Sequence, residues 1–246
     1  MNLSVQHNIV SLDKSVEGSL LLEDGRKKSD PSLCVEIVLV MIVAIGAIKI
    51  FEAGTPLVPA WLMTPGILIV AALLPAAIRK EGFQPLGFNV KYLRDSLAVL
   101  GWTCLALFPL TFCGLWILKS CGFDFFLWPV NPRRSGWISW IIYQFMYIAL
   151  AEEVFFRGYL QSNILRLTKP IMGKWPGRWR WMSIGLSAAC FAVAHIIIQG
   201  HIGSALTFLP GLVLGWLFIR TQSLWAPILF HGLANAFYLA MSVVFA

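Results

Sequence analysis

Residues 137–161 read WISWIIYQFMYIALAEEVFFRGYLQ, and this stretch decides the fold. It is longer than the roughly 20 residues that an α-helix needs to cross a bilayer. Its apolar residues do not alternate with polar ones, as the strands of a membrane barrel require, so the stretch predicts a transmembrane helix. It also holds Glu152, Glu153 and Arg157, and charged side chains are costly inside a bilayer. We therefore expect these three residues to have a specific role.

The whole chain shares this apolar character. Of its 246 residues, 58% are hydrophobic and 13% are charged, against about 45–50% and about 25% in an ordinary soluble domain. Nineteen Lys and Arg and twelve Asp and Glu are too few to cover a soluble protein of this length. The composition therefore argues against a soluble enzyme, a disordered protein and a disulfide scaffold. It also argues against a nucleic-acid partner, despite the net charge of +7.

Seven apolar stretches follow a polar tail of residues 1–32, which we expect to be flexible. They predict an all-α, polytopic transmembrane helical bundle over residues 33–246, with about seven spans and a range of six to eight. The predicted spans are residues 33–51, 59–78, 93–118, 137–161, 182–198, 203–219 and 225–245.

The basic residues predict the orientation of the bundle. With the amino terminus inside, fourteen of the nineteen Lys and Arg fall in cytoplasmic segments and three fall in outside segments. Cytoplasmic loops of membrane proteins carry such an excess of Lys and Arg. The amino terminus is therefore predicted to be cytoplasmic, and the net positive charge follows mainly from the topology.

Polar residues inside the predicted spans are the candidates for function. After residue 125 the chain holds only two acidic residues, Glu152 and Glu153. The same region also holds Arg157, His195, His231 and Asn235 inside predicted spans. In the first span, Glu36 and Lys49 lie near opposite ends, where we expect long side chains to reach the bilayer surface.

Helical spacing sorts the charged residues of the fourth span. Glu153 and Arg157 are four residues apart, so they share a face and can form an ion pair. Glu152 is turned from Glu153 by about 100°, which leaves its carboxylate without that partner. The same spacing of four joins two further pairs, His231 with Asn235 and Phe191 with His195.

The depths of these residues decide whether they can meet. Counted at 1.5 Å per residue from the cytoplasmic ends, Glu152, His231 and Asn235 lie about 9–15 Å deep. His195 comes out deeper, at about 20 Å, on the same count. We expect the four side chains to meet if the helix of His195 tilts, as average tilts of about 20° permit.

Three motifs built from these residues resemble the CPBP family of intramembrane proteases, the CAAX-processing and bacteriocin-processing family that is also called abortive-infection-like. Residues 152–157, EEVFFR, match its EExxxR motif. Residues 191–195, FAVAH, match FxxxH, and residues 231–235, HGLAN, match HxxxN/D. The resemblance covers about residues 137–246, the protease-like core.

This resemblance implies an endopeptidase that hydrolyses a peptide bond of a membrane-associated substrate. By the family pattern, Glu152 is the general base that activates water and His195 helps to hold that water. His231 and Asn235 then stabilise the oxyanion of the tetrahedral intermediate. The other motif residues are expected to support the structure: Glu153, Arg157 and Phe191.

A metal-free site is favoured over a metal site. Glu152, His195 and His231 could supply three zinc ligands, with water as the fourth. However, the chain has no HExxH motif, and Glu153 is the one further carboxylate that could orient the histidine ligands. We therefore expect no cofactor, with zinc as the alternative.

Two other functions remain as alternatives. A proton-coupled transporter would use the same polar groups as a relay, but no inverted repeat is visible in the sequence. A non-catalytic membrane scaffold or immunity factor on the same fold is the other, because a fold does not fix a function.

The expected partners are the lipid bilayer and a membrane-associated peptide or protein. The short chain favours a bacterial inner (plasma) membrane, and the substrate stays open between prenylated CAAX tails, bacteriocin leaders and sorting-signal proteins.

Overall fold

The computed structural model describes residues 31–54, 60–79, 87–88, 93–123, 136–168 and 177–245. The predicted tail, residues 1–32, lies almost wholly outside this part of the chain. Helices dominate the described residues and no strand occurs among them, which confirms the prediction of an all-α bundle.

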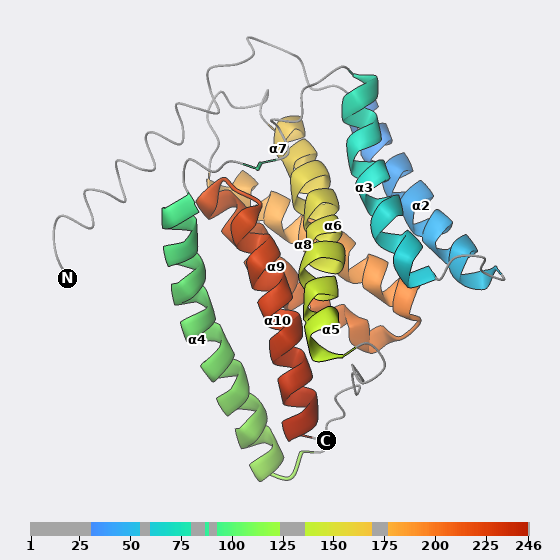
Figure 1. The fold of residues 1–246 in the computed structure, drawn as a ribbon. Helices are drawn as coiled ribbons and strands as arrows, with labels where there is room; N and C mark the ends of the chain where they lie inside the picture. Colours follow the sequence, from blue (N-terminus) through green and yellow to red (C-terminus); the bar gives the residue numbers. More distant parts are fainter. Residues whose placement is uncertain are drawn as a thin grey trace, which may run out of the picture.

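The helical segments of this part correspond to the seven predicted spans (Figure 1). The first three are α2 (Pro31–Ala53), α3 (Ala60–Ile78) and α4 (Leu93–Ser120). The fourth is continuous and alternates α and π turns: α5 (Trp137–Tyr143), η3 (Gln144–Ala149), α6 (Leu150–Glu153), η4 (Val154–Gln161) and α7 (Ser162–Thr168). The last three are α8 (Gly177–Gln199), the 3-10 turn η6 (Ile202–Thr207) with α9 (Phe208–Thr221), and α10 (Trp225–Val244).

Six helices of the described part are long and apolar enough to cross a bilayer. They are α2, α4, the continuous fourth helix, α8, η6 with α9, and α10. The apolar stretch Met63–Ile78 of α3 is shorter. The chain is therefore an integral multi-pass membrane protein within the predicted range of spans. The cytoplasmic amino terminus and the bacterial inner membrane stay predictions.

The continuous fourth helix, which we call the central helix, lies in the middle of the bundle (Figure 1). It packs against α3 through α6 and η4, against α10 through η3, and against α8 through η4. α2 packs on α3 at one side of the bundle, and α4 packs on α10 and α9 at the other. Three different helices therefore meet the central helix near Glu152 and Glu153.

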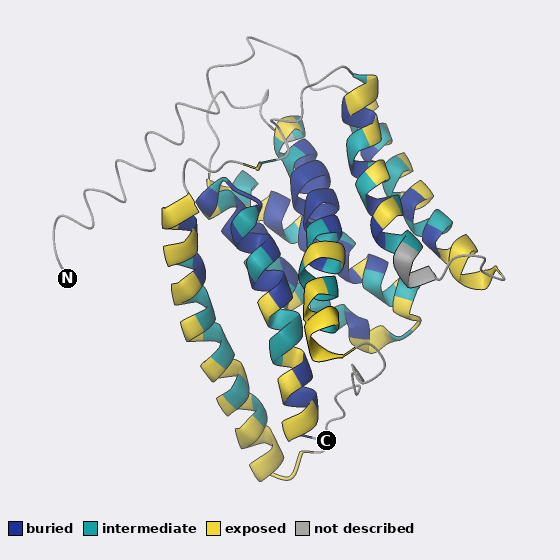
Figure 2. Cartoon of the chain, in the orientation of Figure 1, coloured by how far each residue is buried: buried dark blue, intermediate teal, exposed yellow. Residues whose placement is uncertain are grey.

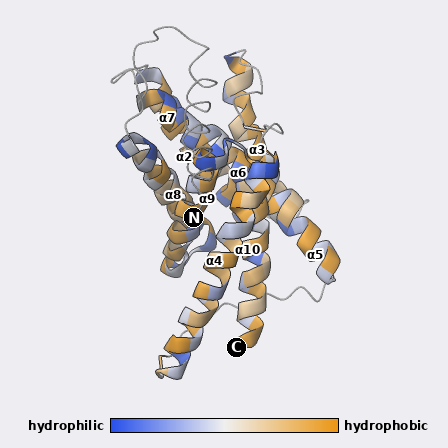
Figure 3. Ribbon diagram, turned by 90° about the vertical axis from the view of Figure 1, so that its left-hand side faces the viewer, coloured by the Kyte–Doolittle hydropathy of each residue, from blue (hydrophilic) through white to orange (hydrophobic). Residues whose placement is uncertain are grey.

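Burial follows this arrangement (Figure 2). All eight residues of η4 are buried, whereas α4 buries only Ser96 and Leu100 of its 28 residues. The exposed surface of α4 is apolar, and Figure 3 shows hydrophobic residues along most of its length. Such a surface suits a helix that faces lipid, because lipid chains are as apolar as the side chains that they contact.

Glu36 has two partners that the sequence did not predict. Its carboxylate pairs with Arg79 and accepts a hydrogen bond from the Tyr159 hydroxyl at 3.0 Å. It therefore links α2 to the end of α3 and to η4. Lys49 pairs with the exposed Glu52 one turn along α2, at 2.8 Å.

Candidate active site

Two π-helical segments flank the Glu152–Glu153 pair in the central helix. π turns are closed by i→i+5 hydrogen bonds and often occur at functional sites. η3 ends just before α6, and η4 begins just after it, so both glutamates lie on one short α turn. On a regular α-helix Gln144 and Glu152 would point about 80° apart, yet both line one cavity. The wider turns of η3 account for this shared face.

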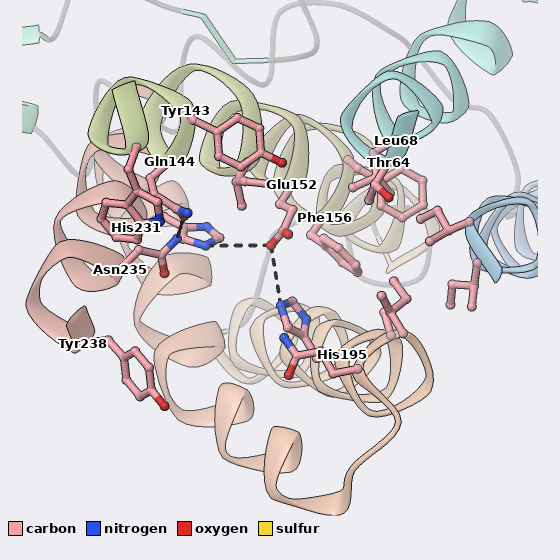
Figure 4. Close-up of a pocket in the computed structure, with 18 residues that line it drawn as sticks. Thr64, Leu68, Tyr143, Gln144, Glu152, Phe156, His195, His231, Asn235 and Tyr238 are labelled. Atoms are coloured by element: carbon pink, nitrogen blue, oxygen red, sulfur yellow. Dashed lines mark hydrogen bonds and ion pairs between the residues drawn. The ribbon is translucent and has the colours of Figure 1, made fainter. Parts of the chain in front are cut away.

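Glu152 lies between two histidines from other helices (Figure 4). Its Oε2 atom is 3.8 Å from Nε2 of His195 on α8 and 3.8 Å from Nε2 of His231 on α10. The three side chains are between 8% and 17% exposed. Both distances exceed a direct hydrogen bond, for which N···O separations are about 2.7–3.2 Å. The structure thus brings together three of the four residues that the motifs assign to catalysis.

The depth of His195 is explained by the true ends of the helices. The fourth helix continues to Thr168, beyond the predicted end at residue 161. Glu152 is therefore about 24 Å along the axis from that end, and His195 is about 27 Å from the start of α8 at Gly177. The difference between the two counts is therefore smaller than the difference obtained from the predicted helix ends.

The ion pair predicted within the central helix is present and fully buried. Arg157 Nη1 lies 2.9 Å from Glu153 Oε1, and neither side chain is exposed. The same oxygen accepts a hydrogen bond from His231 Nδ1 at 2.8 Å. This second contact was not expected, because spacing along one helix gives no information on residues 78 positions apart. It leaves His231 Nε2 directed at Glu152.

Phe191 connects the ion pair to the histidines. The Arg157 guanidinium lies over the Phe191 ring, 4.7 Å from its centroid, and donates to the Gly211 carbonyl oxygen at 3.2 Å. The ring itself packs against His195 at 4.3 Å and edge-on against His231 at 6.0 Å. The Phe191 ring therefore contacts Arg157 and both histidines.

His195 is held by its own helix. Its Nδ1 lies 2.9 Å from the carbonyl oxygen of Phe191, one turn earlier. A carbonyl oxygen can only accept, so Nδ1 carries the proton of this bond. In the neutral imidazole Nε2 is then an acceptor that faces Glu152.

Asn235 lines the same cavity but has a different partner. Its side-chain nitrogen donates to Oε1 of Gln144 on η3 at 2.8 Å. Gln144 was not among the predicted site residues. The signal that could have revealed it is a carboxamide inside an apolar span, eight residues before Glu152.

A cavity of about 400 Å³ lies over Glu152. Its polar lining includes both histidines, Asn235 and Gln144, and Figure 4 shows these side chains around one opening. Its apolar lining includes a wall from α2 and α3, with Ile45, Ile48 and Leu68, and aromatic side chains of the central helix such as Phe155 and Phe156. The volume falls within the range of about 300–1,000 Å³ that is typical of ligand sites. The site therefore combines reactive groups with an apolar wall that could contact a hydrophobic side chain.

Among the residues that the structure describes, no group of three or more His, Cys, Asp and Glu side chains is arranged to hold a metal ion. This includes the alternative zinc ligands Glu152, His195 and His231. The expectation of no cofactor, with zinc as the alternative, stays a prediction.

Comparison with known families agrees with the motifs. Residues 134–237 match the family described as "Rce1-like: Type II CAAX prenyl endopeptidase Rce1-like". The matched segment contains the central helix, α8, α9 and about the first two thirds of α10. Comparison with curated proteins and with solved structures gave no match.

Proposed function

We propose that this chain, which carries an Rce1-like CAAX endopeptidase domain of the CPBP family at residues 134–237, hydrolyses peptide bonds with Glu152 as general base. The resemblance to that family is confirmed, and it gives the class of reaction: proteolysis by a membrane-embedded endopeptidase. The observation that carries the proposal is the position of Glu152 Oε2, 3.8 Å from both histidines and beside the cavity.

The first step needs a water molecule held close to a base. Glu152 Oε2 and His195 Nε2 are both acceptors, and their 3.8 Å separation lets one water molecule donate to each. The water oxygen attacks the carbonyl carbon of the substrate, and its proton moves to the Glu152 carboxylate. The carbon–nitrogen bond then breaks, and Glu152 returns the proton to the leaving amine.

The second requirement is stabilisation of the oxyanion. His231 Nδ1 is bound to Glu153, so only Nε2 can donate to the substrate, and it does so when both ring nitrogens are protonated. Asn235 supplies a second donor from its amide nitrogen. Fixed donors of this kind are each worth about 10²–10³-fold in rate. Because Glu153 is bound to His231 Nδ1, it orients this donor in addition to holding Arg157.

The substrate is proposed to be a membrane-associated peptide with an apolar side chain against the α2–α3 wall. The family description names CAAX prenyl substrates, so a farnesylated peptide ending in a CAAX sequence is the first probe to use. The family match favours proteolysis over the transporter and scaffold alternatives, which lack a comparable observation.

The deciding experiment measures cleavage by the full-length protein in proteoliposomes. The farnesylated peptide is assayed first, and peptides released from membranes are then identified by mass spectrometry. We expect Glu152→Gln to lower cleavage about 10²–10⁴-fold, the range for loss of a general base. Glu52→Gln, a change in the exposed pair of α2, is the matched control and should leave cleavage unchanged.

Two outcomes would contradict parts of the proposal. Cleavage that survives Glu152→Gln, with the same products, removes Glu152 as the base. Cleavage that is lost with a chelator and returns with zinc replaces the metal-free mechanism with the zinc alternative. We expect chelators to have no effect.

A further inference from the structure

We propose that Gln144 is a positioning residue that aims the carboxamide of Asn235 at the reacting carbonyl. This inference rests on the proposed function, because Asn235 acts there as an oxyanion donor. The contact that carries it is the 2.8 Å hydrogen bond from Asn235 Nδ2 to Gln144 Oε1, which joins α10 to η3 across 91 positions of the chain.

An asparagine at such a site needs an external partner to fix its orientation. The last torsion of its side chain is broad and roughly two-fold, so the amide can present either end to the cavity. With Nδ2 bound to Gln144, the second N–H of that nitrogen stays available for an oxyanion. Turned by 180°, the same amide would present its carbonyl oxygen, which repels a negative charge. Gln144 presents Oε1, which can only accept, and so holds Asn235 in the first arrangement.

The backbone around this contact is closely packed. A Cβ atom added at Gly232 would lie 2.5 Å from Cδ1 of the Phe145 ring, closer than real Cβ atoms approach other atoms. Gly232 is three residues before Asn235, and Phe145 directly follows Gln144. Gly232 therefore lets the Phe145 ring of η3 lie directly against α10, close to the Gln144–Asn235 bond.

A parallel between the two oxyanion donors supports the assignment. His231 is held by Glu153 at 2.8 Å, and Asn235 is held by Gln144 at 2.8 Å. Both bonds run from the central helix to α10, and Figure 4 shows Gln144, His231 and Asn235 on the same side of the cavity. Each proposed donor thus has its own orienting partner on the helix that carries the proposed base.

The test is a pair of kinetic comparisons in proteoliposomes, with the peptide whose cleavage depends on Glu152. Gln144→Met keeps the length of the side chain and removes its hydrogen bonds. We expect it to lower kcat about tenfold, about 1.4 kcal/mol of transition-state stabilisation, with KM within about twofold of the unchanged protein. Met146→Ala, on the same π segment and 65% exposed, should change neither constant.

The second comparison introduces Gln144→Met into the Asn235→Ala protein. A residue that acts only through Asn235 has nothing left to orient there, so we expect no further loss of kcat. An unchanged kcat in Gln144→Met alone, or an equal loss in both backgrounds, overturns the proposal. If Gln144→Met lowers the unfolding temperature, Gln144→Asn replaces it, because its amide is one methylene too short to reach Asn235.

Failure of this inference differs from failure of the proposed function. If the inference alone is wrong, Glu152→Gln is inactive while Gln144→Met retains full kcat. If the proposed function is wrong, Glu152→Gln itself still cleaves the peptide.

Discussion

Helix α4 and segment η4 are both parts of membrane helices, but they are built in opposite ways. α4 exposes apolar side chains, with Trp102 73% and Leu105 63% exposed. η4 buries all its residues, including Arg157 and Gln161, which are completely enclosed. In lipid, an apolar side chain is stable on the outside of the bundle, whereas a polar one needs a partner inside it. Polar residues therefore mark the interior of this protein.

The largest effect is expected from removing the buried charge partner. Arg157→Met leaves the enclosed Glu153 carboxylate without its cation, and breaking a buried pair in this way costs about 3–5 kcal/mol. Lys49→Met, which breaks the exposed pair with Glu52, should cost about 1 kcal/mol or less. Both losses in the free energy of unfolding are measured by unfolding the protein with heat or denaturant in a mild detergent. Similar losses for the two variants would remove the distinction between inside and outside.

A smaller effect is expected from deleting apolar atoms. Leu160→Ala in η4 opens a cavity around a side chain with no exposure. We expect the free energy of unfolding to fall by about 2–3 kcal/mol, near the lower end of the usual range for such changes. The cavity accounts for most of this loss, because lipid is as apolar as the interior and moving a Leu side chain into it adds little. Leu105→Ala in α4 removes atoms that face lipid and opens no internal cavity, so it should change the free energy of unfolding by no more than about 0.5 kcal/mol. The comparison fails if Leu105→Ala is the more damaging of the two in the same unfolding assay.

The smallest stability effect is expected at a helix contact. Gly232→Ala places a methyl group against the Phe145 ring, and such overpacking costs about 1–3 kcal/mol. It should also lower cleavage, because α10 carries His231 and Asn235. Gly101→Ala on α4 is the matched control, since a Cβ there meets no atom within 4 Å. It should preserve activity and could raise stability slightly, because Ala favours the helix by up to about 1 kcal/mol. Equal activity in the two variants would show that the contact at Phe145 is not needed.

The sequence predicted what depends on local spacing and on composition. The spans follow from apolar runs, and the Glu153–Arg157 pair follows from the helical repeat. The contact of Glu152 with both histidines was expected because so few ionisable residues lie inside the spans, and each needs a polar partner there.

Contacts that depend on the rotation of one helix against another were not predictable from spacing. The bond between Glu153 and His231, the bond between Gln144 and Asn235, and the pairing of Glu36 all belong to this group. The π turns were also missed, since they change which residues share a face without leaving a pattern in the apolar residues.

One oxygen atom, Glu153 Oε1, serves both Arg157 at 2.9 Å and His231 at 2.8 Å. Replacing a buried ion pair with apolar residues often stabilises a protein, and an engineer seeking a more robust variant would choose this pair first. Here that exchange would also release His231. A change at Glu153 Oε1 would thus affect the stability of the bundle and the rate of cleavage together. Substitutions that raise stability without lowering cleavage must lie elsewhere in the bundle.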